Sequence, residues 1–145
     1  MTVQNFEDLV IFQLARTLSK NIYDITKIGD FKNDFRFVQQ IHASAGSVMD
    51  NVAEGFERQG NKEFINFLYI AKGSCGEVRS QLIRAYDVNF ISEETFKLLY
   101  NDCKKLSAAI LKLIQTLKAS NVTGSRYANP SNPSNPNYSS NSQTI

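Results

Sequence analysis

Apolar residues recur every three or four positions in four successive stretches of this chain. The last stretch is the most regular, because its apolar positions alternate in steps of three and four from Phe96 to Leu117. This spacing places apolar side chains on one face of a helix. No alternation with a period of two competes with it, so the pattern predicts an all-α protein. The expected helices cover residues 5–28, 32–56, 61–88 and 92–118.

Each expected helix has one apolar face, and the connections between helices are short, so neighbouring helices must run antiparallel. The predicted fold is an up-down-up-down four-helix bundle over residues 1–118, about 40 Å long. The four apolar faces are Phe6, Leu9, Phe12, Ala15, Leu18, Ile22 and Ile25; Phe35, Val38, Ile41 or His42, Ala45, Val48 or Met49, Val52 and Phe56; Phe64, Phe67, Leu68, Ala71, Cys75, Val78, Leu82 and Tyr86; and Phe96, Leu99, Cys103, Leu106, Ile110, Leu113 and Leu117.

Polar residues and glycines mark the expected helix ends. Asn5, Asn61 and Ser92 stand where N-caps are expected, and Gly29 is placed to end the first helix. Residues 119–145 differ in kind, with three Asn-Pro steps, many serines and almost no aliphatic residues. Such a segment cannot bury enough apolar area to offset its ordering entropy, so the sequence predicts a disordered C-terminal tail.

The second and third expected helices carry runs of small residues on their apolar faces, at Ala43–Ser47 and Ala71–Gly76. Glycine inside a helix costs about 1 kcal/mol relative to alanine. The compensation we expect is a close approach of the two helix backbones. A line of polar residues accompanies each run, and their expected role is a hydrogen-bonded seam that fixes the register of the two helices. The seam residues are Ser47, Asn51, Glu54, Arg58, Ser74, Glu77 and Gln81.

The charge of the chain is unevenly distributed. The formal net charge is only +2, but residues 95–145 contain six basic residues and one acidic residue. The basic residues of the first and fourth helices fall away from the apolar faces at steps of four, seven and eight. They form either an ordinary solvated surface or a basic strip that contacts nucleic-acid phosphates. The candidate phosphate-binding residues are Arg16, Lys20, Lys97, Lys104, Lys105 and Lys112.

Five aromatic residues lie outside the best apolar faces or at their margins, which suggests either the edge of the monomer core or a subunit interface. They are Phe31, Phe37, Tyr69, Phe90 and Tyr100.

Cys75 and Cys103 are expected to be buried free thiols. One histidine and no C-x-x-C spacing argue against a metal site, and no cofactor is expected. No secretory signal or membrane-spanning run is apparent, which suggests a cytoplasmic protein.

A specific pattern lies between Gln40 and Leu82. Its core is Asn-Val-Ala-Glu-Gly at 51–55, followed by F-x-x-F-L-x-I-A-x-G-S at 64–74. The whole pattern comprises Gln40-Ile41, Ser47, Asn51–Gly55, Arg58, Phe64, Phe67-Leu68, Ile70-Ala71, Gly73-Ser74, Glu77 and Gln81-Leu82. In these residues the chain resembles the bacterial four-helix-bundle proteins of the 23S rRNA intervening-sequence family, whose relative is the accessory variability protein of diversity-generating retroelements.

This resemblance, which covers about residues 5–118, implies a ring of identical bundles, usually a pentamer. It also implies a basic surface that binds structured RNA or a reverse transcriptase–RNA complex, with no enzymatic activity. Many members of the family carry two arginines after Gln-Ile, whereas this chain has His42 and Ala43.

Three functions are therefore considered. The first is a homo-oligomeric, RNA-associated scaffold, and the second is a protein-interaction adaptor, for example for a reverse transcriptase. The third is an enzyme that uses Glu54 and Glu77, which requires a pocket joining both carboxylates.

Overall fold

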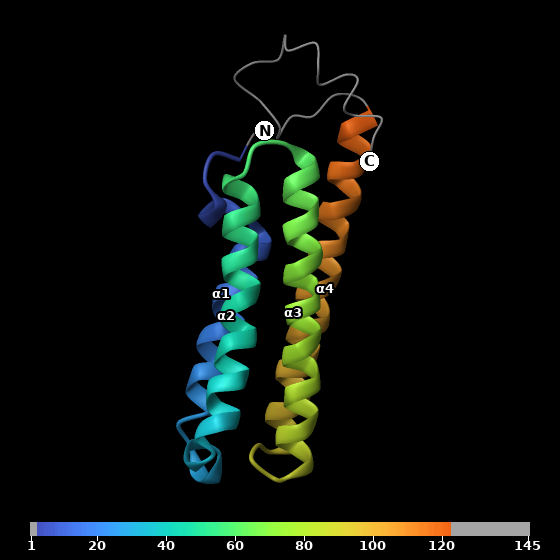
Figure 1. The fold of residues 1–145 in the computed structure, drawn as a ribbon. Coiled ribbons are helices and arrows are strands. Elements are labelled where there is room, and N and C mark those ends of the chain that lie inside the picture. The colour runs from blue at the N-terminus through green and yellow to red at the C-terminus, as the bar shows by residue number, and fades with distance from the viewer. Residues whose placement is uncertain (1–2, 123–145) are drawn as a thin grey trace.

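The structure is a computed structural model that describes residues 3–122, with side chains as far as Ser120. It forms one antiparallel bundle of four long α-helices (Figure 1). The helices are α1 Val10–Ile25, α2 Phe35–Glu57, α3 Asn61–Asp87 and α4 Glu93–Val122, with short 3-10 helices at Phe6–Asp8 and Gly29–Asn33. No strand occurs within residues 3–122. The predicted all-α, up-down-up-down architecture is confirmed.

The first helix is shorter than the apolar pattern predicted. Leu9 adopts an extended conformation, with φ −72° and ψ 133°, which separates the 3-10 turn at Phe6–Asp8 from α1. Asn5 precedes that turn, but its side chain makes no capping hydrogen bond. The helix ends at Ile25, before Gly29, and at its end the Thr26 hydroxyl donates to the carbonyl oxygen of Tyr23 at 2.8 Å. Gly29 instead begins the second 3-10 helix, with φ +60°.

The start of α2 is set by Asp34. Its carboxylate accepts a hydrogen bond from the backbone N–H of Phe37 at 3.1 Å, which satisfies one of the unpaired donors at the helix end. This start leaves Phe35 in the first turn with 75% of its surface exposed, so the prediction that Phe35 belongs to the core was wrong. Phe37, two residues later, is buried.

The starts of α3 and α4 differ in mechanism. Ser92 caps α4 as predicted, because its hydroxyl accepts from the N–H of Thr95 at 3.1 Å. Asn61 does not cap α3. Gly60 holds the N-cap position with φ +93°, and the buried Asn61 amide donates to the carbonyl oxygen of Leu117 on α4 at 3.3 Å. Helix α4 continues to Val122, so the prediction that the tail begins at residue 119 was wrong for residues 119–122. The rest of the predicted disordered tail, residues 123–145, lies outside the described residues.

The core is a single apolar cluster along the bundle axis. The regular spacing in α4 is confirmed, since Leu99, Cys103, Leu106, Ile110 and Leu117 are all buried. Ile114 is also buried and was missed. The two cysteines are buried free thiols, as predicted. The Cys75 thiol donates to the carbonyl oxygen of Cys103 at 3.2 Å. A hydrogen bond with Cys75, together with burial, raises the pKa of the Cys103 thiol.

Helices α2 and α3 pack along their whole length, but the glycines of the small-residue runs do not explain the contact. A Cβ atom added to Gly46, Gly73 or Gly76 would meet no atom within 4 Å. The close approach is at Gly55, where an added Cβ would lie 2.6 Å from Cβ of Phe67 and 3.1 Å from Cδ1 of Phe64. The alanines and serines of the runs do contribute, because Ala45, Ser44, Ala71 and Ser74 are buried.

Three of the five marginal aromatics form an internal cluster at one end of the bundle. The ring centroids of Phe31 and Phe37 are 5.0 Å apart, and those of Phe31 and Phe90 are also 5.0 Å apart. Phe31 has no exposed surface. These rings therefore belong to the monomer core. Tyr69 is exposed and Tyr100 is half-buried.

Candidate nucleic-acid interface

Three of the expected seam residues form a hydrogen-bonded network between α2 and α3. The hydroxyls of Ser47 and Ser74 are 2.8 Å apart across the two helices. The Asn51 amide donates to the carbonyl oxygen of Ser47 at 2.8 Å and to its hydroxyl at 2.9 Å. This small network links the helices at one level of the bundle and fixes their register.

The other predicted seam residues do not join this network. Glu54 and Arg58 form an ion pair on α2 at 2.9 Å, and Arg58 also lies 3.7 Å from Glu63 on α3. Glu77 is exposed and makes no hydrogen bond or ion pair with any described residue. Gln81 is buried, and its side-chain oxygen has no hydrogen-bond partner among residues 3–122.

The register also separates the two carboxylates of the enzyme hypothesis. Ser47 lies level with Ser74. Because α2 and α3 are antiparallel, Glu54 lies seven residues from this level in one direction and Glu77 three residues in the other. At a rise of 1.5 Å per residue, they are about 15 Å apart along the bundle axis. This distance is too large for two carboxylates to share one reacting group, and the geometry does not support the enzyme hypothesis.

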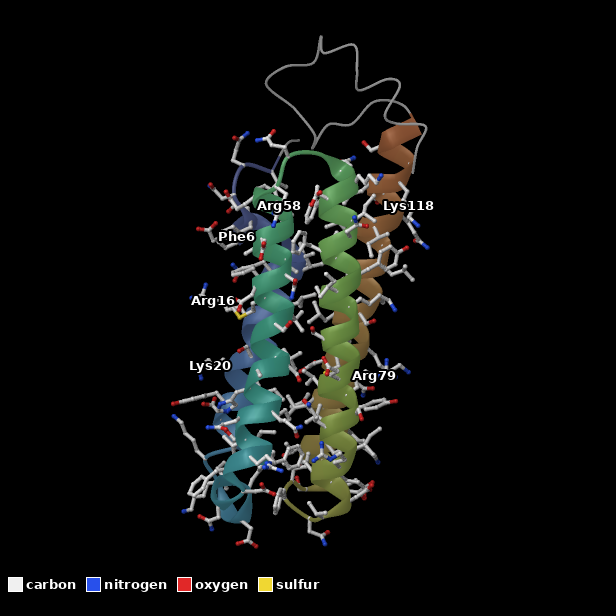
Figure 2. All side chains as sticks on the ribbon, in the orientation of Figure 1. Phe6, Arg16, Lys20, Arg58, Arg79 and Lys118 are labelled. Atoms are coloured by element: carbon white, nitrogen blue, oxygen red, sulfur yellow. The ribbon has the colours of Figure 1, made fainter. Side chains whose placement is uncertain are left out.

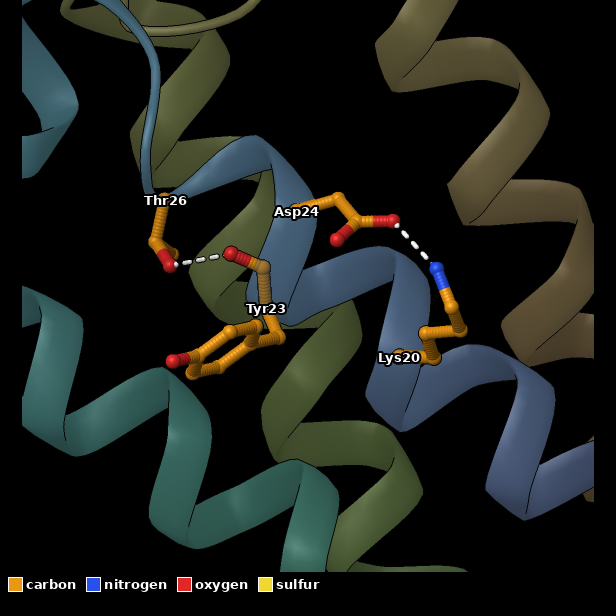
Figure 3. Close-up of polar contacts among 4 residues, drawn as sticks. All are labelled: Lys20, Tyr23, Asp24 and Thr26. Atoms are coloured by element: carbon orange, nitrogen blue, oxygen red, sulfur yellow. Dashed lines mark hydrogen bonds and ion pairs between the residues drawn. The ribbon is translucent and has the colours of Figure 1, made fainter.

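All six candidate phosphate-binding residues have exposed side chains. Two of them are already engaged by carboxylates on their own helix. Lys20 lies 2.9 Å from Asp24 (Figure 3), and Lys97 lies 2.7 Å from Glu93. The hydrogen bond with Lys97 lowers the pKa of the Glu93 carboxyl. Arg16, Lys104, Lys105 and Lys112 have no ion pair among the described residues, so these four are the more available cations.

The lysines of α4 divide between two sides of the helix. Lys112 lines a shallow groove together with Asp8 and Val10, next to the start of α1. Lys105 precedes Lys112 by seven residues and so lies on the same side. Lys104 instead turns toward α3, with its ammonium nitrogen 5.9 Å from the ring centroid of Tyr100.

Three further cations on the α3–α4 side were missed by the sequence analysis. The Arg79 guanidinium lies 5.3 Å from the ring centroid of Tyr100, and the Lys118 ammonium donates to the Tyr69 hydroxyl at 2.9 Å. Lys72 lies on the same side of α3 as Arg79, seven residues earlier. Figure 2 shows Arg79 and Lys118 on the opposite side of the bundle from Arg16 and Lys20. To find them, one must know which residues of α3 and α4 lie level with each other, and the sequence does not state this.

His42 packs between α1 and α2. Nε2 of His42 lies 2.8 Å from the hydroxyl oxygen of Thr26. The same hydroxyl donates a hydrogen bond to the carbonyl oxygen of Tyr23 (Figure 3). A hydroxyl has one proton, so the proton of the other hydrogen bond must come from Nε2. Burial lowers the pKa of His42. The ring is therefore neutral near pH 7, and His42 does not replace a basic residue at this position.

Neither a metal centre nor a membrane span is found in the described part of the chain. No group of three or more histidine, cysteine, aspartate or glutamate side chains there is arranged to hold a metal ion. None of the helices described has the length and apolar character needed to cross a bilayer.

The comparisons with known proteins agree with this fold. Residues 7–112 match the family described as 23S rRNA-intervening sequence protein. No curated protein matches the sequence. A crystal structure from Bacteroides thetaiotaomicron, described as a protein with unknown function from the S23 ribosomal protein family, has a TM-score of 0.68. It is 21% identical, and the match covers 73% of this chain and 96% of that chain, which supports a shared fold. Because the family match spans more than half of the sequence, this chain belongs to the 23S rRNA-intervening sequence protein family.

Proposed function

We propose that this protein is a non-enzymatic, homo-oligomeric scaffold that associates with structured RNA in the cytoplasm. The observation that carries the proposal is the surface of α4 after Asp102. Residues 103–122 contain four lysines and no carboxylate. All four lysines, which are Lys104, Lys105, Lys112 and Lys118, have exposed side chains. A helix with exposed charge of one sign attracts a polyanion.

The proposed mechanism is electrostatic. Cationic side chains replace counterions on the RNA, and the release of those counterions drives association. Several subunits presenting the same surface multiply weak contacts into useful avidity. We assign phosphate contacts to Arg16, Lys20, Lys97, Lys104, Lys105 and Lys112. Lys20 and Lys97 contribute less, because each exchanges an existing ion pair for a phosphate.

A salt titration tests this function. The affinity of the protein for a fluorescein-labelled, structured RNA is expected to fall steeply between about 50 and 200 mM salt, since each phosphate contact adds about 0.9 to the slope of log affinity against log salt. Fluorescence anisotropy measures the affinity at each salt concentration. Binding that is absent at low salt, or that does not change with salt, would contradict an electrostatic RNA contact.

The oligomeric state is a separate part of the proposal. Ile70 and Ile83 on α3 are 52% and 42% exposed, although large apolar side chains gain free energy when they are buried. We propose that they pack against a second copy of the chain, in the five-membered ring that the family resemblance implies. Light scattering coupled to size exclusion should then give a mass several times the 16.3 kDa of one chain. A mass of a single chain at micromolar concentration would contradict the proposal.

The second candidate function is a protein-interaction adaptor, for example for a reverse transcriptase. The apolar groove beside the start of α1 favours it, because Leu9, Val10, Ile11 and Leu113 line this groove. Recovery of one defined protein partner after nuclease treatment would support the adaptor function over the RNA scaffold.

A further inference from the structure

The side of the bundle where α3 meets α4 carries a line of four cations. Lys72 and Arg79 come from α3, and Lys104 and Lys118 come from α4. Lys118 reaches Tyr69 at one end of the line. Arg79 and Lys104 both reach Tyr100 at the other end. Lys104 and Lys118 are fourteen residues apart on one helix, so the line is about 21 Å long.

Two tyrosines hold three of these cations in place. Tyr100 has the Arg79 guanidinium 5.3 Å and the Lys104 ammonium 5.9 Å from its ring centroid. Tyr69 has the Lys118 ammonium 5.3 Å from its ring centroid and also accepts its hydrogen bond. Cation–π contacts stabilise the positions of the cationic side chains. The cations are therefore positioned before any ligand arrives, which lowers the ordering entropy lost on binding.

No carboxylate of the described residues pairs with these four cations. The acidic residues of α3 lie elsewhere. Glu63 is close to Arg58 on α2, Glu77 lies between Ser74 and Gln81 on the side toward α2, and Asp87 lines a hollow with Asp34 at the end of the bundle. Between Lys104 and Lys118 the α3–α4 side is thus a strip of positive charge without an ion pair. The Lys97–Glu93 pair lies on the same side of α4, seven residues before Lys104 and outside the strip.

We propose that these four residues, Lys72, Arg79, Lys104 and Lys118, form the main contact surface for the phosphate backbone of helical RNA. This inference rests on the proposed function and assigns it to one side of the bundle. The strip extends about 21 Å along the two helices, and one strand of a duplex presents several phosphates over that length. Nε of Arg79 is buried and has no hydrogen-bond partner in the described part of the chain, so the Tyr100 ring, rather than an acidic residue, orients the guanidinium.

The same contacts argue against recognition of the RNA base sequence. Proteins that bind unpaired bases stack them on aromatic rings. Here Tyr100 is occupied by two cations and by Phe96, whose ring centroid is 5.4 Å away. Tyr69 engages Lys118 through its hydroxyl. The four cations offer contacts to phosphates, which carry no base sequence.

The test compares two quadruple variants that each lower the net charge by four. The strip variant is K72Q/R79Q/K104Q/K118Q, and the control is K27Q/K32Q/R36Q/K62Q, whose four side chains are exposed elsewhere on the bundle. Anisotropy is measured with a labelled RNA duplex of about 20 base pairs. The strip variant is expected to bind at least about tenfold more weakly at low salt, with the salt slope reduced by about three to four, whereas the control retains most of the affinity.

The other outcomes separate this inference from the function on which it rests. If the wild-type protein binds the duplex and both variants weaken equally, the strip is wrong but RNA association stands. If the wild-type protein does not bind, both are wrong. A strong change in affinity when the base sequence is permuted would also overturn the strip. Should the quadruple variant fail to fold, the double variant K104Q/K118Q, which changes only exposed α4 residues, decides the question by the same comparison.

Discussion

Replacing Phe31 with alanine is expected to lower the free energy of unfolding by about 3–5 kcal/mol, the range found for truncation of buried aromatic side chains. Phe31 has no exposed surface and contacts the rings of both Phe37 and Phe90. The substitution therefore removes the central ring of a cluster that joins the α1–α2 connection to the α3–α4 connection. Chemical denaturation, followed by circular dichroism at 222 nm, measures the change.

Phe35 provides the matched control. It lies four residues along the same segment, but 75% of its surface is exposed. The change Phe35→Ala is expected to alter the free energy of unfolding by less than about 0.5 kcal/mol. If Phe31→Ala changed only the oligomeric mass and left the stability of the subunit intact, Phe31 would belong to a subunit interface and our assignment to the core would be wrong.

The second large effect is expected at Gly55. The change Gly55→Ala gains about 1 kcal/mol from helix propensity, but its Cβ would lie 2.6 Å from Cβ of Phe67 on α3. The Phe67 Cβ is attached directly to the backbone, so the two helices must move apart, and overpacking of this kind costs about 1–3 kcal/mol or more. Because neither Cβ can rotate away, the cost lies at the upper end of this range, and we expect a net loss of about 1–2 kcal/mol in the free energy of unfolding.

Gly46 on the same helix tests whether close packing is the cause. An added Cβ there meets nothing within 4 Å, so Gly46→Ala is expected to stabilise the bundle by about 0.5–1 kcal/mol. Thermal unfolding of the two variants in parallel should therefore shift the midpoint in opposite directions. Shifts of the same sign would show that the α2–α3 approach at Gly55 does not set the distance between the helices.

Local patterns in the sequence were enough to predict the four helices and most of the core. Each helix buries a continuous apolar stripe, and a spacing of three and four residues identifies such a stripe without knowledge of its partner. The cap at Ser92 was equally local. Phe31 was harder to place, because it lies in a short 3-10 segment between helices, where no periodicity indicates which side faces the core.

Features that depend on two helices at once were predicted only in part. A polar seam between α2 and α3 was expected, but the sequence does not state which residues lie level across the two helices. Glu54 and Glu77 were therefore grouped, although they are about 15 Å apart along the axis. Arg79 was missed for the same reason, since its partner Tyr100 lies on another helix. Glycine roles also depend on the partner, as Gly55 and Gly46 show.

The contact between Thr26 and His42 makes the junction of α1 and α2 directly observable. His42 is the only histidine in the chain, so its imidazole proton resonances are free of overlap from other side chains of the same type. Because Nε2 donates to Thr26, the neutral ring is held in one tautomer, which the ¹⁵N chemical shifts of the two ring nitrogens distinguish. A single label can thus follow loosening of the first helix, during RNA titration or assembly, without assignment of the remaining spectrum.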